Sequence, residues 1–202
     1  VILGVEMTPV VVTVDTPRTS PNIIPNWNTP RELLLENLAD MEVQMDTLLR
    51  ATSKDGSGVN THPYSDVYYI GTDAKRHAFP TESVYRSWYE SNQRIVEVPA
   101  WKLANIPLGR NVTFKPGKKL VHVPSETRPY VVAPKRALRP LASEAVAPLV
   151  YGEAWKSIVE RLPETSIADY VWSMEGVINN AYDFNPTTLQ TGYITPSHEI
   201  VD

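Results

Sequence analysis

The apolar positions near the start of the chain predict one strand on an extended arm. A β-branched run, typical of a strand, follows Pro9 and consists of Val10, Val11, Val12, Thr13 and Val14. Prolines then recur between residues 17 and 25, and they predict a stiff, extended connection. We therefore expect residues 1–28 to form an extended N-terminal β arm whose strand pairs with a distant segment or with another subunit.

A second pattern, with apolar residues at spacings of three and four, predicts one long amphipathic helix over residues 29–54. Its apolar stripe consists of Leu34, Leu38, Met41, Met45 and Leu48. Thr29 and Glu32 have the spacing of a capping box around Pro30. The stripe is too short for a typical coiled coil, so packing of this helix on its own domain is favoured.

From residue 64 onward the sequence repeats itself weakly. Tyr68 matches Tyr130, 62 residues later, and Thr81 matches Ser143 at the same offset. Each copy has the pattern of strand, turn, strand and capped helix. We expect a first α+β unit over residues 64–124, with a β-hairpin turning at residues 115–118, and a second unit over residues 125–172. The aromatic residues that follow predict a wrapped C-terminal arm over residues 173–202.

The predicted fold class is therefore α+β. It consists of a duplicated strand-turn-strand-helix unit sharing one core, preceded by an extended β arm and one long amphipathic helix. One shared core is favoured over two because each unit has only about 60 residues.

The charge distribution adds a candidate binding surface. The chain has a formal net charge of −4, yet the segment from Lys102 to Arg139 carries nine basic residues against one acidic residue. The candidate basic patch consists of Lys115, Lys118, Lys119, Arg128, Lys135, Arg136 and Arg139. Such a patch could bind anionic wall polymers or the acidic face of a neighbouring copy, or it could be an ordinary solvated face. Nucleic acid is disfavoured, because the sequence pI is about 5.6 and no recognition motif accompanies the patch.

The candidate chemistry is sparse. The absence of cysteine excludes disulfides, thiolate catalysis and cysteine-based metal sites. The four histidines have no metal-binding spacing, and the sequence has neither a nucleophile elbow nor a phosphate-binding glycine loop. We therefore predict no enzymatic activity, no cofactor and no metal. No apolar run approaches the roughly 20 residues of a membrane-spanning helix.

The segment from about residue 66 to residue 170 resembles a repeat of uncharacterised cell-surface proteins from candidate-phyla (Patescibacteria-like) bacteria. The resemblance is carried by Val67-Tyr68-Tyr69-Ile70-Gly71, Phe79-Pro80-Thr81-Glu82, Asn111-Val112-Thr113-Phe114, Tyr130-Val131-Val132-Ala133 and Tyr151-Gly152-Glu153-Ala154-Trp155. It implies an exported protein and attributes no catalytic residues to the repeat.

These observations lead to two functional expectations. The first is a structural subunit of an extracellular bacterial filament or surface layer, which assembles when its N-terminal strand docks on a neighbouring copy. The alternative is a monomeric cell-surface adhesion module that binds anionic or glycan polymers. In either case we expect an extracellular or cell-surface protein, exported with a signal that is then cleaved.

Overall fold

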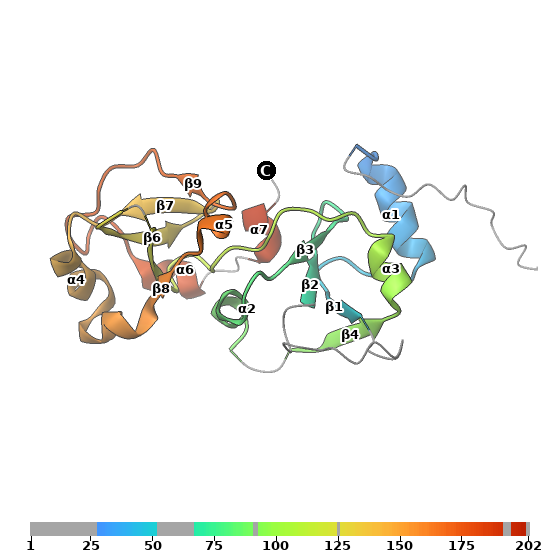
Figure 1. The fold of residues 1–202 in the computed structure, drawn as a ribbon, viewed down its shortest axis with the longest axis horizontal. Helices are drawn as coiled ribbons and strands as arrows, with labels where there is room; N and C mark the ends of the chain where they lie inside the picture. Colours follow the sequence, from blue (N-terminus) through green and yellow to red (C-terminus); the bar gives the residue numbers. More distant parts are fainter. Residues whose placement is uncertain (1–27, 52–66, 91–92, 125, 192–194, 201–202) are drawn as a thin grey trace, which may run out of the picture.

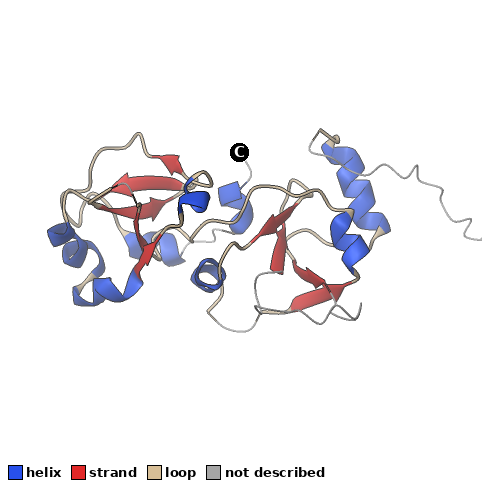
Figure 2. Cartoon of the chain, viewed as in Figure 1, coloured by secondary structure: helices blue, strands red, loops and turns tan. Residues whose placement is uncertain are grey.

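The computed structural model describes residues 28–51, 67–90, 93–124, 126–191 and 195–200. These residues form two lobes that lie side by side along the long axis of the molecule (Figure 1). Short helices surround a small β-sheet in each lobe (Figure 2). The α+β class is therefore confirmed. The predicted strand Val10–Val14 lies outside the described residues.

The first lobe contains a four-stranded sheet with the order β3-β2-β1-β4. Its strands are β1 (Leu48–Ala51), β2 (Val67–Ile70), β3 (Arg76–Ala78) and β4 (Ile95–Val98). The sheet is accompanied by α1 (Arg31–Asp40), α2 (Glu82–Trp88) and α3 (Ala100–Ala104). As predicted, Thr81 caps α2, and its hydroxyl accepts a hydrogen bond of 3.2 Å from the Val84 amide.

The second lobe contains a five-stranded sheet with the order β8-β5-β6-β7-β9. Its strands are β5 (Leu120–His122), β6 (Pro129–Ala133), β7 (Ala137–Pro140), β8 (Val159–Arg161) and β9 (Val171–Trp172). Its helices are the 3-10 segments η2 (Glu144–Val146) and η3 (Glu153–Ile158), with α4 (Ala147–Tyr151), α5 (Glu164–Ile167) and α6 (Pro186–Thr191). A last short helix, α7 (Pro196–Ile200), lies between the two lobes (Figure 1).

The two sheets have the same connectivity. In each, the first strand pairs antiparallel with the second and parallel with the fourth, while the second pairs antiparallel with the third. The register also agrees, since Tyr68 faces Ala78 in the first sheet and Tyr130 faces Pro140 in the second. Both members of the pair are shifted by 62 residues, which is the offset seen in the sequence.

The long helix predicted over residues 29–54 is wrong beyond its first half. Helix α1 ends at Asp40, and residues 48–51 form β1, an inner strand of the first sheet. Glu42 and Asp46 have positive φ angles of 57° and 58°, which end the helical path before the sheet begins. The N-cap is Pro30, without a side-chain hydrogen bond, so the expected capping box is not formed.

The predicted hairpin around residues 115–118 is also wrong. The turn exists, because the Lys118 amide donates to the Lys115 carbonyl at 3.1 Å. However, β5 pairs with β6 and β8, and residues 111–114 form no strand. Val112 and Phe114 are instead buried between the two sheets, where they belong to the hydrophobic core. Residues 109–115 thus form a connecting segment that joins the two lobes through their interior.

Buried residues form three clusters, which define two faces of each sheet. The front face of the first sheet carries Leu48, Val67 and Tyr69 and belongs to the central cluster. Its back face carries Leu49 and Ile70 and is covered by Leu34 and Leu38 of α1 with Leu103 of α3. In the second sheet the back face carries Val121, Tyr130 and Val132 and belongs to the central cluster, whereas the front face carries Leu120 and Val131 and belongs to the third cluster.

His77 holds the start of the connecting segment against the first sheet. Its Nδ1 atom lies 2.8 Å from the Arg110 carbonyl oxygen, and its Nε2 atom lies 2.9 Å from Asp73 Oδ1. Burial opposes ionisation of Asp73, but the hydrogen bond and charge of His77, together with the amide and charge of Lys75, outweigh it and lower the pKa of this carboxyl. A Cβ atom at Gly109 would lie 2.2 Å from His77 Cε1, so this approach requires glycine.

Gly109→Ala should therefore lower the free energy of unfolding by about 1–3 kcal/mol, because the added methyl group displaces the buried His77 ring. Urea denaturation followed by circular dichroism measures the change. Gly176→Ala is the matched control, since a Cβ atom there meets nothing within 4 Å; its effect should stay within about 0.5 kcal/mol. Equal effects of the two substitutions would contradict this account of Gly109.

Candidate functional site: the junction between the lobes

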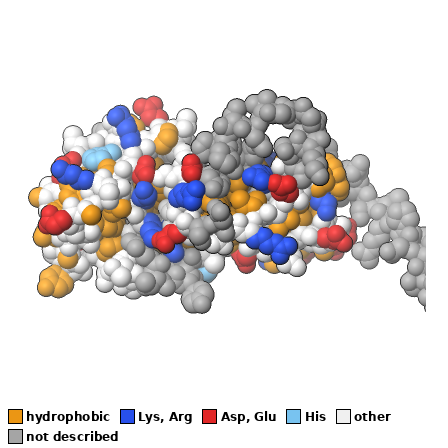
Figure 3. All heavy atoms as spheres, turned by 90° about the horizontal axis from the view of Figure 1, so that it is seen from below, with side chains coloured by type: hydrophobic (Ala, Val, Ile, Leu, Met, Phe, Trp, Pro, Cys, Tyr) orange, Lys and Arg blue, Asp and Glu red, His pale blue; other side chains and the backbone are white. Residues whose placement is uncertain are grey.

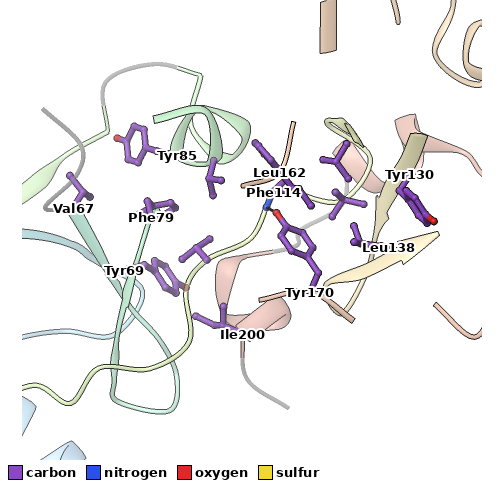
Figure 4. Packing of buried hydrophobic residues seen from close by; sticks show 14 of the residues in the cluster. Val67, Tyr69, Phe79, Tyr85, Phe114, Tyr130, Leu138, Leu162, Tyr170 and Ile200 are labelled. Carbon is purple, nitrogen blue, oxygen red and sulfur yellow. Dashed lines mark hydrogen bonds between the residues drawn. The ribbon is translucent and has the colours of Figure 1, made fainter. Parts of the chain in front are cut away.

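The main structural site of the molecule is the junction where the front face of the first sheet packs on the back face of the second. The central cluster contains Tyr69, Phe79 and Tyr85 from the first lobe together with Leu138 and Leu162 from the second (Figure 4). Phe79 and Tyr85 meet edge to face, with ring centroids 5.3 Å apart. One cluster of buried apolar residues therefore joins the two sheets.

The connecting segment places polar backbone groups inside this junction, and side chains of both lobes bind them. Trp88 Nε1 donates to the Thr113 carbonyl at 2.8 Å, and the Lys115 amide donates to Ser87 Oγ at 3.0 Å. The Phe114 amide donates to the Tyr170 hydroxyl oxygen at 3.1 Å. Burial raises the pKa of Tyr170, so this phenol stays protonated over the physiological range. Each of these bonds satisfies a backbone group that is partly or fully buried.

A small cavity of about 130 Å³ lies where α2 meets β8 and α5. The first lobe lines it with Thr81, Ser83 and Val84. The second lobe lines it with residues that include Glu160, Arg161, Leu162, Pro163 and Ser166. Ser83 Oγ donates to Glu160 Oε1 at 2.5 Å, and Lys119 Nζ lies 2.9 Å from the same oxygen. Burial opposes ionisation of Glu160, but these two donors outweigh it and lower its pKa.

Helix α7 joins the β2–β3 turn of the first sheet to the β6–β7 turn of the second. Ser197 Oγ accepts a hydrogen bond of 3.1 Å from the Thr72 amide and lies 3.1 Å from the Tyr69 hydroxyl. Glu199 Oε2 accepts a hydrogen bond of 2.9 Å from the Arg136 amide. Ile200 completes the contact by packing into the central cluster. A single helical turn thus binds corresponding turns of both sheets.

The environment of Glu199 is unusual for a carboxylate, because the residue is 3% exposed. Burial raises the pKa of Glu199 above its ordinary value. The amides of Arg136 and Lys135 and the charges of His198 and Arg136 act in the opposite direction without cancelling the effect of burial. Protonation of Glu199 is therefore easier in the folded protein than in the unfolded chain.

The residues of the predicted basic patch are distributed over several local contacts. Lys118 lies 2.5 Å from Glu90 Oε1, Lys119 pairs with Glu160, and Arg139 lies 2.9 Å from Glu175 Oε2. Lys115 lies over the Trp88 ring, Arg136 is buried, Lys135 is exposed and Arg128 is half-buried. Acidic and basic side chains are intermingled on the face seen in Figure 3. The structure therefore brings together Lys115 and Lys118 on one turn but does not gather all seven residues.

Sequence reasoning missed α7 and the polar contacts of the junction. The five residues of α7 carry no apolar periodicity, and Ser197 and Glu199 acquire their roles from turns more than 60 residues away. His77 and His122 each lie beside one carboxylate, at 2.9 Å from Asp73 and 3.9 Å from Glu144. Within the described part of the chain, no group of three or more histidine, aspartate and glutamate side chains could hold a metal ion.

Comparison with family models, with curated proteins and with solved structures finds no match to this chain. None of the helices in the described ranges is long and apolar enough to cross a membrane.

Glu199→Ala should lower the free energy of unfolding by about 1–3 kcal/mol, because it leaves the buried Arg136 amide without its acceptor. Glu199→Gln keeps an acceptor oxygen and is the matched control, with a smaller expected loss. Urea denaturation of both variants at one pH tests this. A Gln variant as unstable as the Ala variant would show that hydrogen bonding is not what Glu199 contributes.

The raised pKa of Glu199 also predicts a pH dependence. A solvated glutamate titrates near about 4.3, so the stabilisation from protonating Glu199 is complete below this pH and is lost as pH rises through the higher pKa of the folded state. Relative to the wild type, Glu199→Gln should therefore gain stability as pH increases from about 4. Unfolding free energies of both proteins between about pH 4 and pH 8 give the difference. A difference that is constant, or that falls with pH, would contradict the prediction.

Proposed function

We propose that the chain is a structural module built from a duplicated unit whose copies stack front to back. Three sets of contacts support duplication. Leu48 faces Ile95 as Leu120 faces Val159, and the Tyr68–Ala78 pair corresponds to Tyr130–Pro140. The Gly109 amide donates to the Arg76 carbonyl as the Ser173 amide donates to the Leu138 carbonyl. Register, topology and hydrogen bonding thus agree between the two lobes.

The main support for a structural role is the direction in which the two units stack. The front face of one sheet packs on the back face of the next, so the two contacting surfaces are different. Repeat proteins use such contacts, in which each unit buries its apolar face on its neighbour. We propose a structural subunit of an extracellular bacterial filament or surface layer, and the resemblance of residues 66–170 to a repeat of bacterial cell-surface proteins supports the location.

In this proposal the strand Val10–Val14 joins subunits by pairing with an open sheet edge of a neighbouring copy. Strands β4 and β8 occupy one end of their sheets, so each leaves an edge to which no described strand is paired. An added strand would form backbone hydrogen bonds along such an edge. Its alternate valines would contact the faces of the sheet.

The alternative function, a monomeric adhesion module for anionic or glycan polymers, has one supporting observation. Trp101, Trp172 and Tyr182 are large exposed aromatic side chains, and aromatic faces can bind sugar rings. The anionic branch of this alternative has less support, because Lys118, Lys119 and Arg139 are engaged with carboxylates.

Deletion of residues 1–16 tests the strand-docking proposal. The truncated chain should remain folded, since residues 28–200 supply both sheets and the three core clusters described above. It should sediment as a single chain under conditions in which the full chain forms filaments or sheets in negative-stain electron microscopy. A truncated chain that still assembles would overturn docking by the N-terminal strand.

A further inference from the structure

The internal junction has open counterparts at the two far ends of the molecule. At the junction, α2 of the first lobe contacts the segment 160–166 of the second lobe, which comprises β8 and the start of α5. By the matched registers, α2 corresponds to η2 and α4, and residues 160–166 correspond to residues 96–102. Figure 1 shows α4 at one end of the long axis and α3, which contains residues 100–104, towards the other.

The end of the first lobe carries a hollow at the corresponding place. This β4 hollow has a volume of about 690 Å³ and is lined by residues that include Val96, Glu97, Val98, Pro99 and Lys102. Their counterparts are Glu160, Arg161, Leu162, Pro163 and Ser166, which line the junction cavity together with residues of α2. The same positions that receive a helix inside the molecule therefore line an open surface at its end.

The end of the second lobe exposes the corresponding helix. Ser87 of α2 is 3% exposed at the junction, whereas its counterpart Leu149 of α4 is 61% exposed. Ala145 of η2, the counterpart of Ser83, is exposed as well. Ile178, Phe184 and Leu189 pack with Val146 and Ala147 in the third cluster. Ala145 and Leu149 therefore remain as an exposed apolar strip of the η2–α4 segment.

The side chains exposed at the two ends are complementary to each other. At the junction, Ser83 donates a hydrogen bond to Glu160, so both members of the pair are polar. Their counterparts at the ends, Ala145 and Val96, are both apolar, and Val96 is 36% exposed. A polar pair has thus been replaced by an apolar pair at both positions together. Burial of two such side chains against each other is favourable.

We propose that the β4 hollow of one copy receives the η2–α4 segment of a second copy, at the positions that correspond to the contact between α2 and segment 160–166. The contact is confined to this edge, because α1 and α3 cover the rest of the back face of the first sheet. Ala145 and Leu149 of the incoming copy then pack against Val96 and its neighbours. The two surfaces differ, so the contact is head to tail and continues from copy to copy along the long axis. This inference rests on the proposed structural function and names the surfaces that would carry it.

Ala145→Arg and Val96→Arg test the contact from its two sides. Each substitution places a charge on an exposed position, so both chains should fold with a Tm close to that of the wild type. Each variant alone should lose long assemblies and sediment as one chain of 22.7 kDa. An equimolar mixture should form a species of two chains and nothing longer, because one intact hollow and one intact helix remain. Met174→Arg, at a fully exposed position on neither surface, is the control and should assemble like the wild type.

The outcomes separate this inference from the proposed function. If both variants assemble like the wild type while deletion of residues 1–16 abolishes assembly, the helix contact is wrong and the structural function stands. If each variant is monomeric and the mixture gives no two-chain species, the two surfaces do not bind each other. If the wild-type chain stays monomeric at every concentration in analytical ultracentrifugation, both proposals fail.

Discussion

The fold depends on burial of apolar surface between the front face of the first sheet and the back face of the second. Each sheet has short strands whose side chains alternate between two apolar faces, so each needs a cover on both sides. Helices α1 and α3 cover the outer face of the first sheet, and the segment around Ile178 and Phe184 covers that of the second. The inner faces cover each other. Because small sheets are marginally stable without such cover, we expect neither lobe to persist alone.

Burial at the junction imposes a second requirement, because the backbone amides and carbonyls placed there need hydrogen-bond partners. The connecting segment and the turns of both sheets bring amides and carbonyls into a partly or fully buried region. Side chains from distant parts of the chain bind them: Trp88 and Ser87 from α2, Tyr170 after α5, and Ser197 and Glu199 from α7. An unmade bond at any of these groups would cost more than the made bond contributes. Ser197 and Glu199 therefore position α7 between the lobes together with the packing of Ile200.

The sequence predicted the elements whose signals are local. The strand β6, the Thr81 cap of α2 and the offset of 62 residues all follow from short patterns. The prediction of one helix over residues 29–54 is wrong because apolar residues keep the helical spacing of three and four beyond the end of α1. The chain turns there at Glu42 and Asp46, which have positive φ angles. The predicted hairpin is wrong because the apolar side chains of Val112 and Phe114 pack between the two sheets. Their apolar character does not mark a strand that pairs with β5. Helix α7 and the dispersal of the basic residues depend on contacts distant in sequence, which no local pattern encodes.

Differences between the two lobes bear on which surfaces can meet. If η2 and α4 replaced α2 at the junction, Ala145 would stand where Ser83 donates, and the partly buried Glu160 would lose one of its hydrogen bonds. If α2 were placed in the β4 hollow, the hydroxyl of Ser83 would face Val96, which offers no side-chain acceptor. Each wrong combination leaves a polar group without a partner, and such penalties discriminate between surfaces more sharply than changes in apolar area do. The internal junction and the end surfaces are thus chemically distinct although their positions correspond, so the proposed docking between copies would not compete with folding of a single chain.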